Sequence, residues 1–361
     1  MDQALNWARR GLLIASPNPQ VGCVLTLGNG AVIGEGHTQH AGGAHAEVMA
    51  LRDAAAKGHD ARGATVYVTL EPCAHHGRTG PCCDALIAAG VKTVVASIAD
   101  PNPLVAGQGF TRLRAAGVHV EIGEGAAEAR ELNIGFFSRM IRKTPWVRMK
   151  IAASLDGTTA LHNGQSQWIT GDAARSDGHA WRARASAVLT GIGTVLKDNP
   201  LLDVRHVVTL RQPHLVVVDS RLETPPDARL FGPKRQVLVY AAIDDATKKA
   251  PLEAAGATVI CLPGVTGKVD LSAMMQDLAQ REVNELHVEA GSKLNASLIQ
   301  AGVVDEYLVY LAPLLLGPGQ GLAALPQLTE LTGGGALNFI SAQMVGNDLR
   351  VIARGIGRDA F

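Results

Sequence analysis

One histidine, one glutamate and two cysteines of this chain have the types and spacing to activate water on a zinc ion. His45-Ala-Glu47 places an imidazole two residues before a carboxylate, and Cys73 and Cys82, each after a proline, supply two thiols. A catalytic zinc has three protein ligands, one open position for water, and a nearby acid/base group that is not a ligand. His45, Cys73 and Cys82 are therefore candidate metal ligands, and Glu47 is the candidate catalytic residue.

Residue type alone leaves other interpretations of this segment open. His75, His76 and Cys83 are further possible ligands. Each cysteine could instead be a small buried apolar residue, and His45 a hydrogen-bonded core histidine. The ordered set His-x-Glu, Pro-Cys, Pro-Cys favours zinc over that alternative. Two thiolates and a neutral imidazole balance Zn²⁺, and Glu47 would carry a proton from water to a leaving amine, so that a ring amino group is replaced by oxygen.

The bulk composition predicts a two-domain protein without a broad charged surface. The chain has 361 residues, 47% hydrophobic and 18% charged, with 33 basic and 33 acidic side chains. The length exceeds one ordinary core, and the zero net charge argues against nucleic acid or a membrane as partner. Three of five cysteines lie in one loop, which favours metal binding in a reduced compartment over disulfides. No stretch approaches the roughly 20 apolar residues of a membrane span. We expect a cytoplasmic protein.

Strand and helix patterns alternate through both halves, which predicts α/β layers. An ideal helix points residues i and i+2 to different sides, so His45 and Glu47 can share a site only in the first turn of their helix. The pattern breaks between about 138 and 145, so we expect domains at 1–143 and 144–361. In the first half we predict helices over 1–10, 45–57 and 81–90, and strands over 21–25, 31–34, 65–70 and 92–97. In the second half we predict strands over 146–153, 187–190, 214–218, 236–240, 258–261, 285–289 and 306–310.

Three segments of the first half resemble the zinc-dependent cytidine deaminase superfamily: Pro17-Asn-Pro-Gln-Val-Gly22, His45-Ala-Glu-Val48 and Thr69-Leu-Glu-Pro-Cys-Ala-His-His-Gly-Arg78. Within it, the long insert between the cysteines is similar to the bifunctional riboflavin-biosynthesis deaminase/reductase family. The resemblance implies a cytidine-deaminase-like three-layer sandwich, with zinc on His45, Cys73 and Cys82 and with Glu47 as proton shuttle. It also implies that Asn18 holds the pyrimidine edge, that His76 faces the substrate and that Cys83 is not a ligand.

Loops of the second half resemble the reductase half of the same family, whose fold is similar to dihydrofolate reductase. They are Lys150–Gly157, Gly164–Thr170, Gly193–Pro200, Leu201–Arg205 and Val218–Ser220. No G-x-G-x-x-G follows a strand, so a Rossmann dinucleotide site is not predicted. The resemblance implies that NADPH contacts Ala152, Trp168, Thr194, Asp198, Ser220, Gly291, Ser292, Lys293, Leu294, Asn295, Ala296 and Ser297. It implies that the phosphoribosyl substrate contacts Ser166, Arg182, Leu202, Arg205 and Glu289.

The second half also contains residues whose chemistry fits such a ligand. The guanidinium groups of Arg182 and Arg205 match phosphate oxygens, although each arginine alone would be read as a solvated surface charge. The Glu289–Ser292 junction leads from a strand into a helix whose N–H groups could hold a phosphate. Lys150 and Asp198 are the candidate proton donors for a reduction.

The chain departs from the family at four positions. Gly43 stands where a Glu is usual, Met49 where a His is usual, Gly80 where a Pro is usual and Thr158 where a Lys or Arg is usual. None of these changes removes a candidate ligand or Glu47.

The leading prediction is a two-step enzyme. It would deaminate 2,5-diamino-6-(5-phosphoribosylamino)pyrimidin-4(3H)-one with zinc and then reduce the ribosyl group to ribityl with NADPH. One alternative is a deaminase of another nucleoside or of a tRNA base, with a decayed second domain. Another is a zinc-stabilised binding protein without catalysis, which would have no use for the carboxylate of Glu47. We expect a homo-oligomer, a dimer through the reductase domain.

Overall fold

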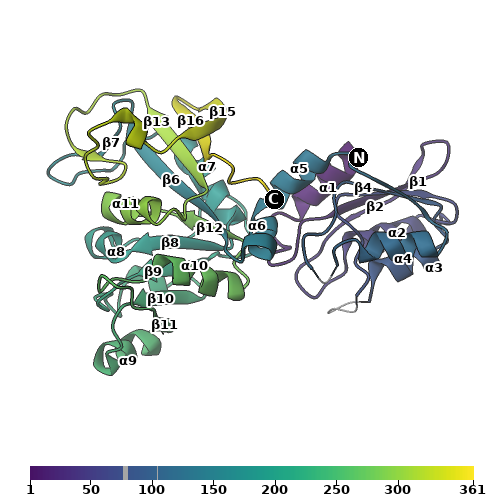
Figure 1. Cartoon of the computed structure of the whole chain (residues 1–361), viewed down its shortest axis with the longest axis horizontal. Coiled ribbons are helices and arrows are strands. Elements are labelled where there is room, and N and C mark those ends of the chain that lie inside the picture. The colour runs from purple at the N-terminus through teal and green to yellow at the C-terminus, as the bar shows by residue number, and fades with distance from the viewer. Residues whose placement is uncertain (76–79, 104) are drawn as a thin grey trace. The chain divides into compact units, whose positions relative to one another are not determined.

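The computed structural model describes residues 1–75, 80–103 and 105–361, and its chain divides into two compact units. The first unit contains Met1–Lys143 together with Phe361, and the second contains Thr144–Ala360 (Figure 1). Both mix helices and strands, which confirms the predicted α/β class. Within the described part of the chain, no helix combines the length and the apolar character needed to cross a membrane.

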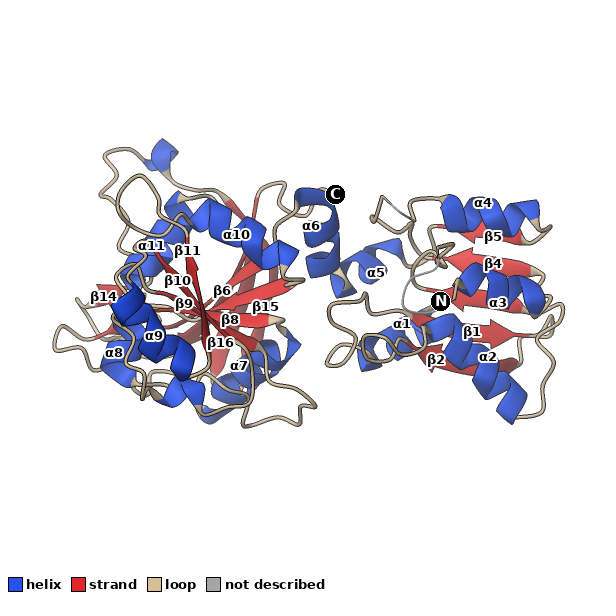
Figure 2. Cartoon of the chain, turned by 90° about the horizontal axis from the view of Figure 1, so that it is seen from below, coloured by secondary structure: helices blue, strands red, loops and turns tan. Residues whose placement is uncertain are grey.

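The first unit has a five-stranded sheet in the order β2-β1-β3-β4-β5. The β1–β2 hairpin is antiparallel, β1 also runs antiparallel to β3, and β3, β4 and β5 are parallel (Figure 2). Its strands are β1 (Gly22–Thr26), β2 (Val32–His37), β3 (Thr65–Val68), β4 (Thr93–Ala96) and β5 (His119–Ile122). Its helices are α1 (Asp2–Arg10), α2 (Ala46–Ala56), α3 (Cys82–Ala88), α4 (Gln108–Ala115), α5 (Ala126–Leu132) and α6 (Ile134–Arg142).

Helix α2 lies unusually close to β2, because two positions of that strand have no side chain. A Cβ on Gly36 would come within 2.5 Å of the Met49 Cβ and 2.7 Å of the Ala50 nitrogen. A Cβ on Gly34 would come within 2.3 Å of the Ala50 oxygen. Any larger residue there would push the helix away from the sheet. The close approach fixes the N-terminal end of α2, where His45 lies.

The second unit has a nine-stranded sheet in the order β11-β10-β9-β8-β12-β6-β13-β16-β15. A second, two-stranded sheet pairs β14 with β7. The strands are β6 (Trp146–Ser154), β7 (Thr158–Ala160), β8 (Ala187–Gly191), β9 (His214–Val218), β10 (Val237–Ala241), β11 (Ala257–Cys261), β12 (Glu285–Val288), β13 (Glu306–Ala312), β14 (Gln320–Gly321), β15 (Leu337–Val345) and β16 (Asp348–Gly355). The helices are α7 (Asp172–Arg184), α8 (Ile192–Asp198), α9 (Ala246–Ala254), α10 (Leu271–Gln280) and α11 (Ser292–Gln300), with short 3-10 turns at Arg229–Phe231 and Leu331–Gly333.

Apolar clusters lie on both faces of the large sheet. On one face, Met274 of α10 and Leu298 of α11 pack with the strands. On the other face, Val195 of α8 and Leu252 of α9 pack with different side chains of the same strands. Helix α7 packs through Ala174 and Trp181 against β13 and β16. The parallel part of the sheet, which runs from β11 through β10, β9, β8, β12 and β6 to β13, is thus covered on both faces. The continuous apolar runs of these strands require this.

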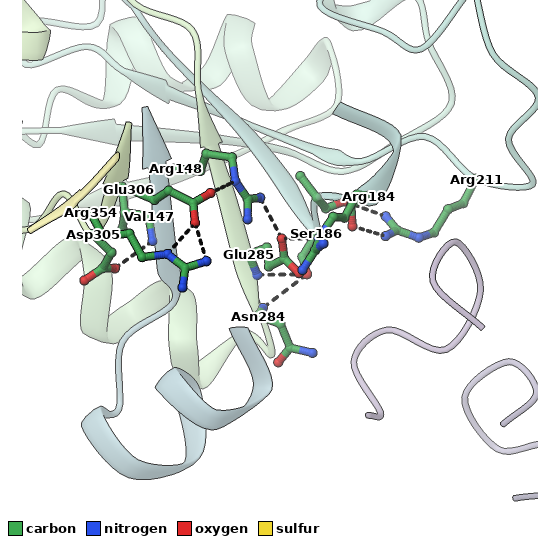
Figure 3. Close-up of polar contacts among 11 residues, drawn as sticks. Val147, Arg148, Arg184, Ser186, Arg211, Asn284, Glu285, Asp305, Glu306 and Arg354 are labelled. Atoms are coloured by element: carbon green, nitrogen blue, oxygen red, sulfur yellow. Dashed lines mark hydrogen bonds and ion pairs between the residues drawn. The ribbon is translucent and has the colours of Figure 1, made fainter. Parts of the chain in front are cut away.

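A chain of buried charges lies between α7 and the sheet (Figure 3). Arg148 of β6 bonds to Glu306 of β13 and, at 2.7 Å, to Glu285 of β12. Arg184, at the end of α7, donates to Glu285 at 2.8 Å, and Arg354 of β16 donates to Glu306 at 2.8 Å. Arg148, Glu285 and Glu306 are each buried, so each charge depends on its partners for the stabilisation that water would give.

Several sequence-based assignments need correction. The predicted helix of 81–90 begins at Cys82, with Pro81 as its N-cap and not as its first residue. The pattern predicted an interruption from Arg139 onward, but α6 continues to Arg142. The strands β5, β7, β14, β15 and β16 were not predicted. The helix 1–10, the hairpin around 28–30 and the seven predicted strands of the second half are confirmed, each within a few residues.

We predict that Glu285→Gln destabilises the second unit strongly. Arg148 and Arg184 would then share a neutral acceptor, and removing one partner of a buried ion pair typically costs about 3–5 kcal/mol. Denaturant unfolding followed by tryptophan fluorescence measures this, because three of the four tryptophans (Trp146, Trp168 and Trp181) lie in the second unit. As a control, Glu223→Gln removes an exposed partner of Arg221 and should cost less than about 1 kcal/mol.

The same substitution should change the response to acid. Burial by itself would raise the pKa of Glu285, but Arg184 and Arg148 outweigh burial and lower it to about 2 from an ordinary 4.5. A carboxyl with a lowered pKa stabilises the fold above its ordinary pKa and loses this contribution as the pH falls towards the lowered value. The parent should therefore lose more stability than Glu285→Gln between about pH 4.5 and 2. Equal losses in the two proteins, or a cost no larger than that of Glu223→Gln, would contradict the account.

Candidate active sites

Three soft ligand atoms of the first unit converge on one point. His45 is the N-cap of α2, Cys73 lies after β3, and Cys82 is the first residue of α3. The His45 Nδ1 atom is 3.6 Å from the Cys73 Sγ atom and 3.3 Å from the Cys82 Sγ atom, and the three ligand atoms all lie within 4.8 Å of one another. Two thiols and one imidazole at these separations fit a tetrahedral zinc with one position left for water.

Cys83 is turned away from this cluster. Its thiol donates to the Pro72 carbonyl oxygen at 3.2 Å and to the Gly109 carbonyl oxygen at 3.5 Å. Burial raises the pKa of this thiol to about 12, whereas a metal ligand must be a thiolate. The alternative ligand Cys83 therefore does not fit the site. His75 is exposed, and His76, the predicted substrate contact, lies outside the described residues.

Glu47 lies beside the cluster in the first turn of α2, as the helix geometry requires. Only 4% of its surface is exposed. Burial, and next the negative charge of Cys73, raise its pKa to about 7. Its carboxylate is thus buried and close to the candidate ligands without being one of the three convergent atoms. This is the arrangement expected of an acid/base group that serves a metal site.

The two thiols affect one another directly. The main-chain N–H of Cys82 donates to the Cys73 Sγ atom at 3.3 Å. A hydrogen bond with the Cys82 thiol lowers the pKa of Cys73, and the same bond raises the pKa of Cys82. The hydrogen bond of His45 with Cys73 raises the pKa of His45. Two thiolates side by side are stable only if a cation neutralises them, which agrees with the zinc interpretation.

Glu71 fixes the backbone next to the site, a role that the sequence did not predict. Its buried carboxylate accepts main-chain N–H groups from Asp100, Gly107, Gly109 and Phe110, at distances of 2.9 to 3.4 Å. Because Glu71 is two residues before Cys73, these bonds fix the backbone that carries the thiol. Their sequence separation of about 30 to 40 residues explains why local pattern gave no sign of them.

The remaining predicted features of the first unit have clear locations. Asn18 lies in the loop between α1 and β1, where its N–H bonds to the Ala15 carbonyl oxygen at 2.9 Å. Gly43 and Gly80, two of the departures from the family pattern, line a cavity of about 390 Å³ together with Arg52. Met49, the third, packs against the bare surface of Gly36.

Predicted cofactor contacts of the second unit gather at the carboxyl ends of its parallel strands. Thr194 follows β8, Ser220 follows β9 and Gly291 follows β12. A Cβ on Gly291 would be 4.0 Å from the Thr194 Oγ1 atom, and a Cβ on Gly191 would be 2.9 Å from Leu294. The starts of α8 and α11 therefore lie side by side. This edge of an open α/β sheet is where such proteins bind ligands.

Other predicted cofactor contacts are less available. Asn295 and Ala296 are buried, and the Asn295 amide donates to the Leu322 carbonyl oxygen at 2.8 Å. Trp168 is 69% exposed, and the Arg175 guanidinium lies over its ring at 4.7 Å. Thr158, the fourth departure from the family, is buried, and its hydroxyl donates to the Gly317 carbonyl oxygen at 2.8 Å. The remaining predicted cofactor contacts are Ala152 on β6, Asp198 at the end of α8, and Ser292, Lys293 and Ser297 on α11. Of the predicted substrate contacts, Ser166 lies before α7, and Leu202 is buried in the segment after α8.

Two predicted substrate residues are bonded to each other. The Arg182 Nε atom donates to Glu289 Oε1 at 2.7 Å, and its Nη2 atom donates to Oε2 at 2.9 Å. Burial would raise the pKa of Glu289, but the charges of Arg182 and Lys150 outweigh it and hold the pKa well below its ordinary value. Arg182 is thus committed to a carboxylate. Arg205 is exposed, and its guanidinium pairs with the carboxylate of Asp203, two residues before it.

Comparison with known proteins decides between the functions considered above. Residues 145–351 match the family described as the RibD C-terminal domain, and residues 1–98 match the cytidine and deoxycytidylate deaminase zinc-binding region. The riboflavin biosynthesis protein RibD of Escherichia coli strain K12 is 44% identical, over 97% of this chain and 96% of that protein. RibD of Haemophilus influenzae is 41% identical, over 97% and 95%.

The chain belongs to the RibD family. A solved structure of Acinetobacter baumannii RibD covers 98% of this chain, at 39% identity and with a TM-score of 0.89. The Thermotoga maritima diaminohydroxyphosphoribosylaminopyrimidine deaminase/5-amino-6-(5-phosphoribosylamino)uracil reductase covers 98%, at 32% identity and with a TM-score of 0.86. Like other members of the RibD family, the chain is a bifunctional deaminase and reductase of riboflavin biosynthesis, with zinc and NADPH as cofactors. The predicted function, enzyme class and cofactors are confirmed.

Proposed function

We propose that the first unit deaminates 2,5-diamino-6-(5-phosphoribosylamino)pyrimidin-4(3H)-one and that the second unit reduces the ribosyl group of the product to ribityl with NADPH. The observation that carries the first half is the buried carboxylate of Glu47 beside three convergent ligand atoms. The second half is supported by the RibD C-terminal match over residues 145–351 and by the strand-end loops that precede α8 and α11.

The first unit's residues have separate roles in this proposal. His45, Cys73 and Cys82 would hold zinc, which would supply a water of lowered pKa. Glu47 takes a proton from the attacking water and passes it to the leaving amine, so that ammonia departs and a ring carbonyl remains. Its burial keeps bulk water from competing for that proton. Asn18 and His76 orient the pyrimidine.

In the second unit, NADPH supplies the hydride, and the protein binds and orients the two reactants. The start of α11 can hold a cofactor phosphate, because the first N–H groups of a helix have no partner within it. Arg205 is the candidate ligand for the substrate phosphate. Lys150 is a better candidate proton donor than Asp198, because burial lowers the pKa of its ammonium group. The negative charge of Glu289 opposes this effect in part, and the pKa remains lowered. Together these residues serve one small-molecule substrate.

We further propose that the protein forms a homodimer through its second unit. The edge strand β15 exposes Leu337, Phe339, Ile340 and Met344 by 44%, 81%, 47% and 64%. A long edge strand with apolar side chains invites pairing with another chain unless something covers it. A second copy offers the same edge and can cover it symmetrically.

Sedimentation equilibrium tests the dimer. We expect a mass of twice the 37.7 kDa of one chain for the parent and a shift towards the monomer for Phe339→Asp. Val265→Asp is the matched control, because Val265 is fully exposed away from β15 and its replacement should leave the dimer intact. A monomeric parent at micromolar concentration would contradict the proposal.

The ligand assignment predicts a contrast between neighbouring cysteines. Cys82→Ser removes a soft ligand and should lose most of the bound zinc, whereas Cys83→Ser should keep about one zinc per chain. Elemental analysis of the purified, dialysed variants measures this. Retention of zinc by Cys82→Ser together with its loss from Cys83→Ser would show that the assignment is wrong.

The proton-shuttle role predicts a selective loss of one activity. Glu47→Gln keeps the shape of the side chain but cannot carry the proton, so deamination should fall by about 10²–10⁴-fold. Ammonia release measures deamination, while zinc content and NADPH oxidation with pre-deaminated substrate should stay at parental values. Deamination by Glu47→Gln at nearly the parental rate would disprove this role.

A further inference from the structure

The segment 201–205, which carries Arg205, has no regular secondary structure. Its main-chain polar groups bond instead to side chains from distant parts of the second unit. The side-chain amide of Gln212 bonds to both main-chain polar groups of Val204, as a paired strand would. Its oxygen accepts the Val204 N–H at 2.8 Å, and its NH₂ group donates to the Val204 carbonyl oxygen at 3.1 Å. Arg235 donates to the carbonyl oxygens of Leu201 and Leu202, and Arg182 donates to that of Asp203. Within the loop, the Arg205 guanidinium also pairs with the Asp203 carboxylate. The main chain of the loop is therefore fixed mainly by side chains that lie outside it.

His179 makes the corresponding bond at Arg205 itself. The Arg205 main-chain N–H donates to the His179 Nδ1 atom at 3.3 Å. His179 lies on α7, one turn before Arg182, and only 6% of its surface is exposed. The Arg182 Nη1 atom also lies 3.4 Å from the same Nδ1 atom. His179 thus connects the Arg205 loop to the Arg182–Glu289 ion pair.

The two neighbours of this nitrogen determine its protonation. Both the Arg205 N–H and the Arg182 guanidinium are donors, so Nδ1 must present a lone pair and the ring proton must reside on Nε2. A doubly protonated ring would direct an N–H group at two donors, one of them cationic. The geometry therefore requires a neutral imidazole.

The charges around His179 agree with this requirement. Burial is the largest influence on its pKa, followed by Arg182 on the same helix and by His206 and Arg205 on the facing loop, while Glu289 of the sheet acts in the opposite direction. The net effect lowers the pKa to about 4. The His206 ring packs edge-on against His179, with centroids 4.6 Å apart. The ring is therefore neutral and held in place at physiological pH.

We propose that His179 is a positioning residue for the reductase: its neutral imidazole holds the main chain of Arg205 and so directs the Arg205 guanidinium at the phosphate of the substrate. This inference rests on the proposed function, in which Arg205 binds that phosphate. His179 itself need not contact the substrate. Its role is to convert an irregular loop into a fixed cation site, since a guanidinium on a loose loop would lose conformational entropy on binding.

Two substitutions of similar polarity separate this role from general packing. The amide oxygen of His179→Asn can occupy the position of Nδ1, whereas that of His179→Gln reaches the position of Nε2. Both variants lose the ring and its contact with His206, so they differ mainly in where the acceptor lies. Only the asparagine can accept the Arg205 N–H as the native ring does.

The readout is the preference of the reductase for a phosphorylated substrate. kcat/KM is measured for the deaminated ribosylamine with and without its 5′-phosphate, in the full-length protein with NADPH. Because one hydrogen bond is lost, we expect His179→Gln to reduce the preference about tenfold and His179→Asn to keep it within about threefold. The KM for NADPH and the deaminase activity of the first unit should not change.

A double mutant tests whether His179 acts through Arg205. If it does, Arg205→Ala alone removes most of the preference, and adding His179→Gln causes little further loss. Additive losses, equal behaviour of the Asn and Gln variants, or an equal fall on both substrates would overturn the inference. Near-UV circular dichroism of each variant checks that the second unit is folded.

The same data distinguish the inference from the function on which it rests. If the parent shows no preference for the phosphorylated substrate, or Arg205→Ala retains that preference, the proposed phosphate ligand is wrong and the role of His179 falls with it. If the parent and Arg205→Ala behave as proposed but His179→Gln keeps the preference, only the role of His179 is wrong.

Discussion

The active site of the first unit depends on the convergence of three ligand atoms beside one buried carboxylate. Two thiols, one imidazole and the Glu47 carboxylate come from α2, the end of β3 and the start of α3. Without a cation, the pKa values of Cys82 and Glu47 are raised, so these groups tend to stay protonated and fewer negative charges lie side by side. With zinc, the two thiolates and the imidazole would balance the charge of the ion, and Glu47 would remain free as an acid/base group.

Several backbone features of the first unit hold the three candidate ligands in place. Gly34 and Gly36 allow α2 to lie directly on β2, which fixes His45 at the end of the helix. Glu71 binds four main-chain N–H groups and fixes the approach to Cys73. Pro72 and Pro81 restrict the backbone directly before Cys73 and Cys82.

The second unit solves a different problem, because it must hold several arginines close together without zinc. It does so by pairing them with buried carboxylates: Glu285, Glu289 and Glu306 each bond to at least one arginine. Figure 3 shows the pairs of Glu285 with Arg148 and Arg184 and of Glu306 with Arg148 and Arg354, which connect α7 to the sheet. Buried ion pairs contribute little net stability, but they constrain the geometry strongly. If one partner moves away, the other charge is left buried without a partner or water to solvate it. This fits a site that must recognise a phosphate.

Local signals allowed much of the fold and the metal site to be predicted from sequence. His45 at a helix start and the glycines of the β1–β2 turn act over a few residues. What could not be predicted depends on distant contacts or on missing periodicity. Strand β15 shows no clean alternation, because it is exposed on both faces and its register shifts between Phe339 and Ser341. The roles of Glu71, His179 and Gln212 arise only when remote segments meet. The Arg182–Glu289 pair likewise required the structure, since each residue alone was taken for a substrate contact.

The order and coupling of the two reactions are tested by their stoichiometry in one preparation of the parent protein. The purified chain is given the phosphoribosyl diaminopyrimidine, and ammonia and NADPH are followed together. The account predicts ammonia release without NADPH, no NADPH oxidation before deamination, and, with NADPH present, one NADPH oxidised for each ammonia released. Oxidation of NADPH by the amino substrate before any ammonia appears, or release of ammonia with no later oxidation of NADPH, would contradict it.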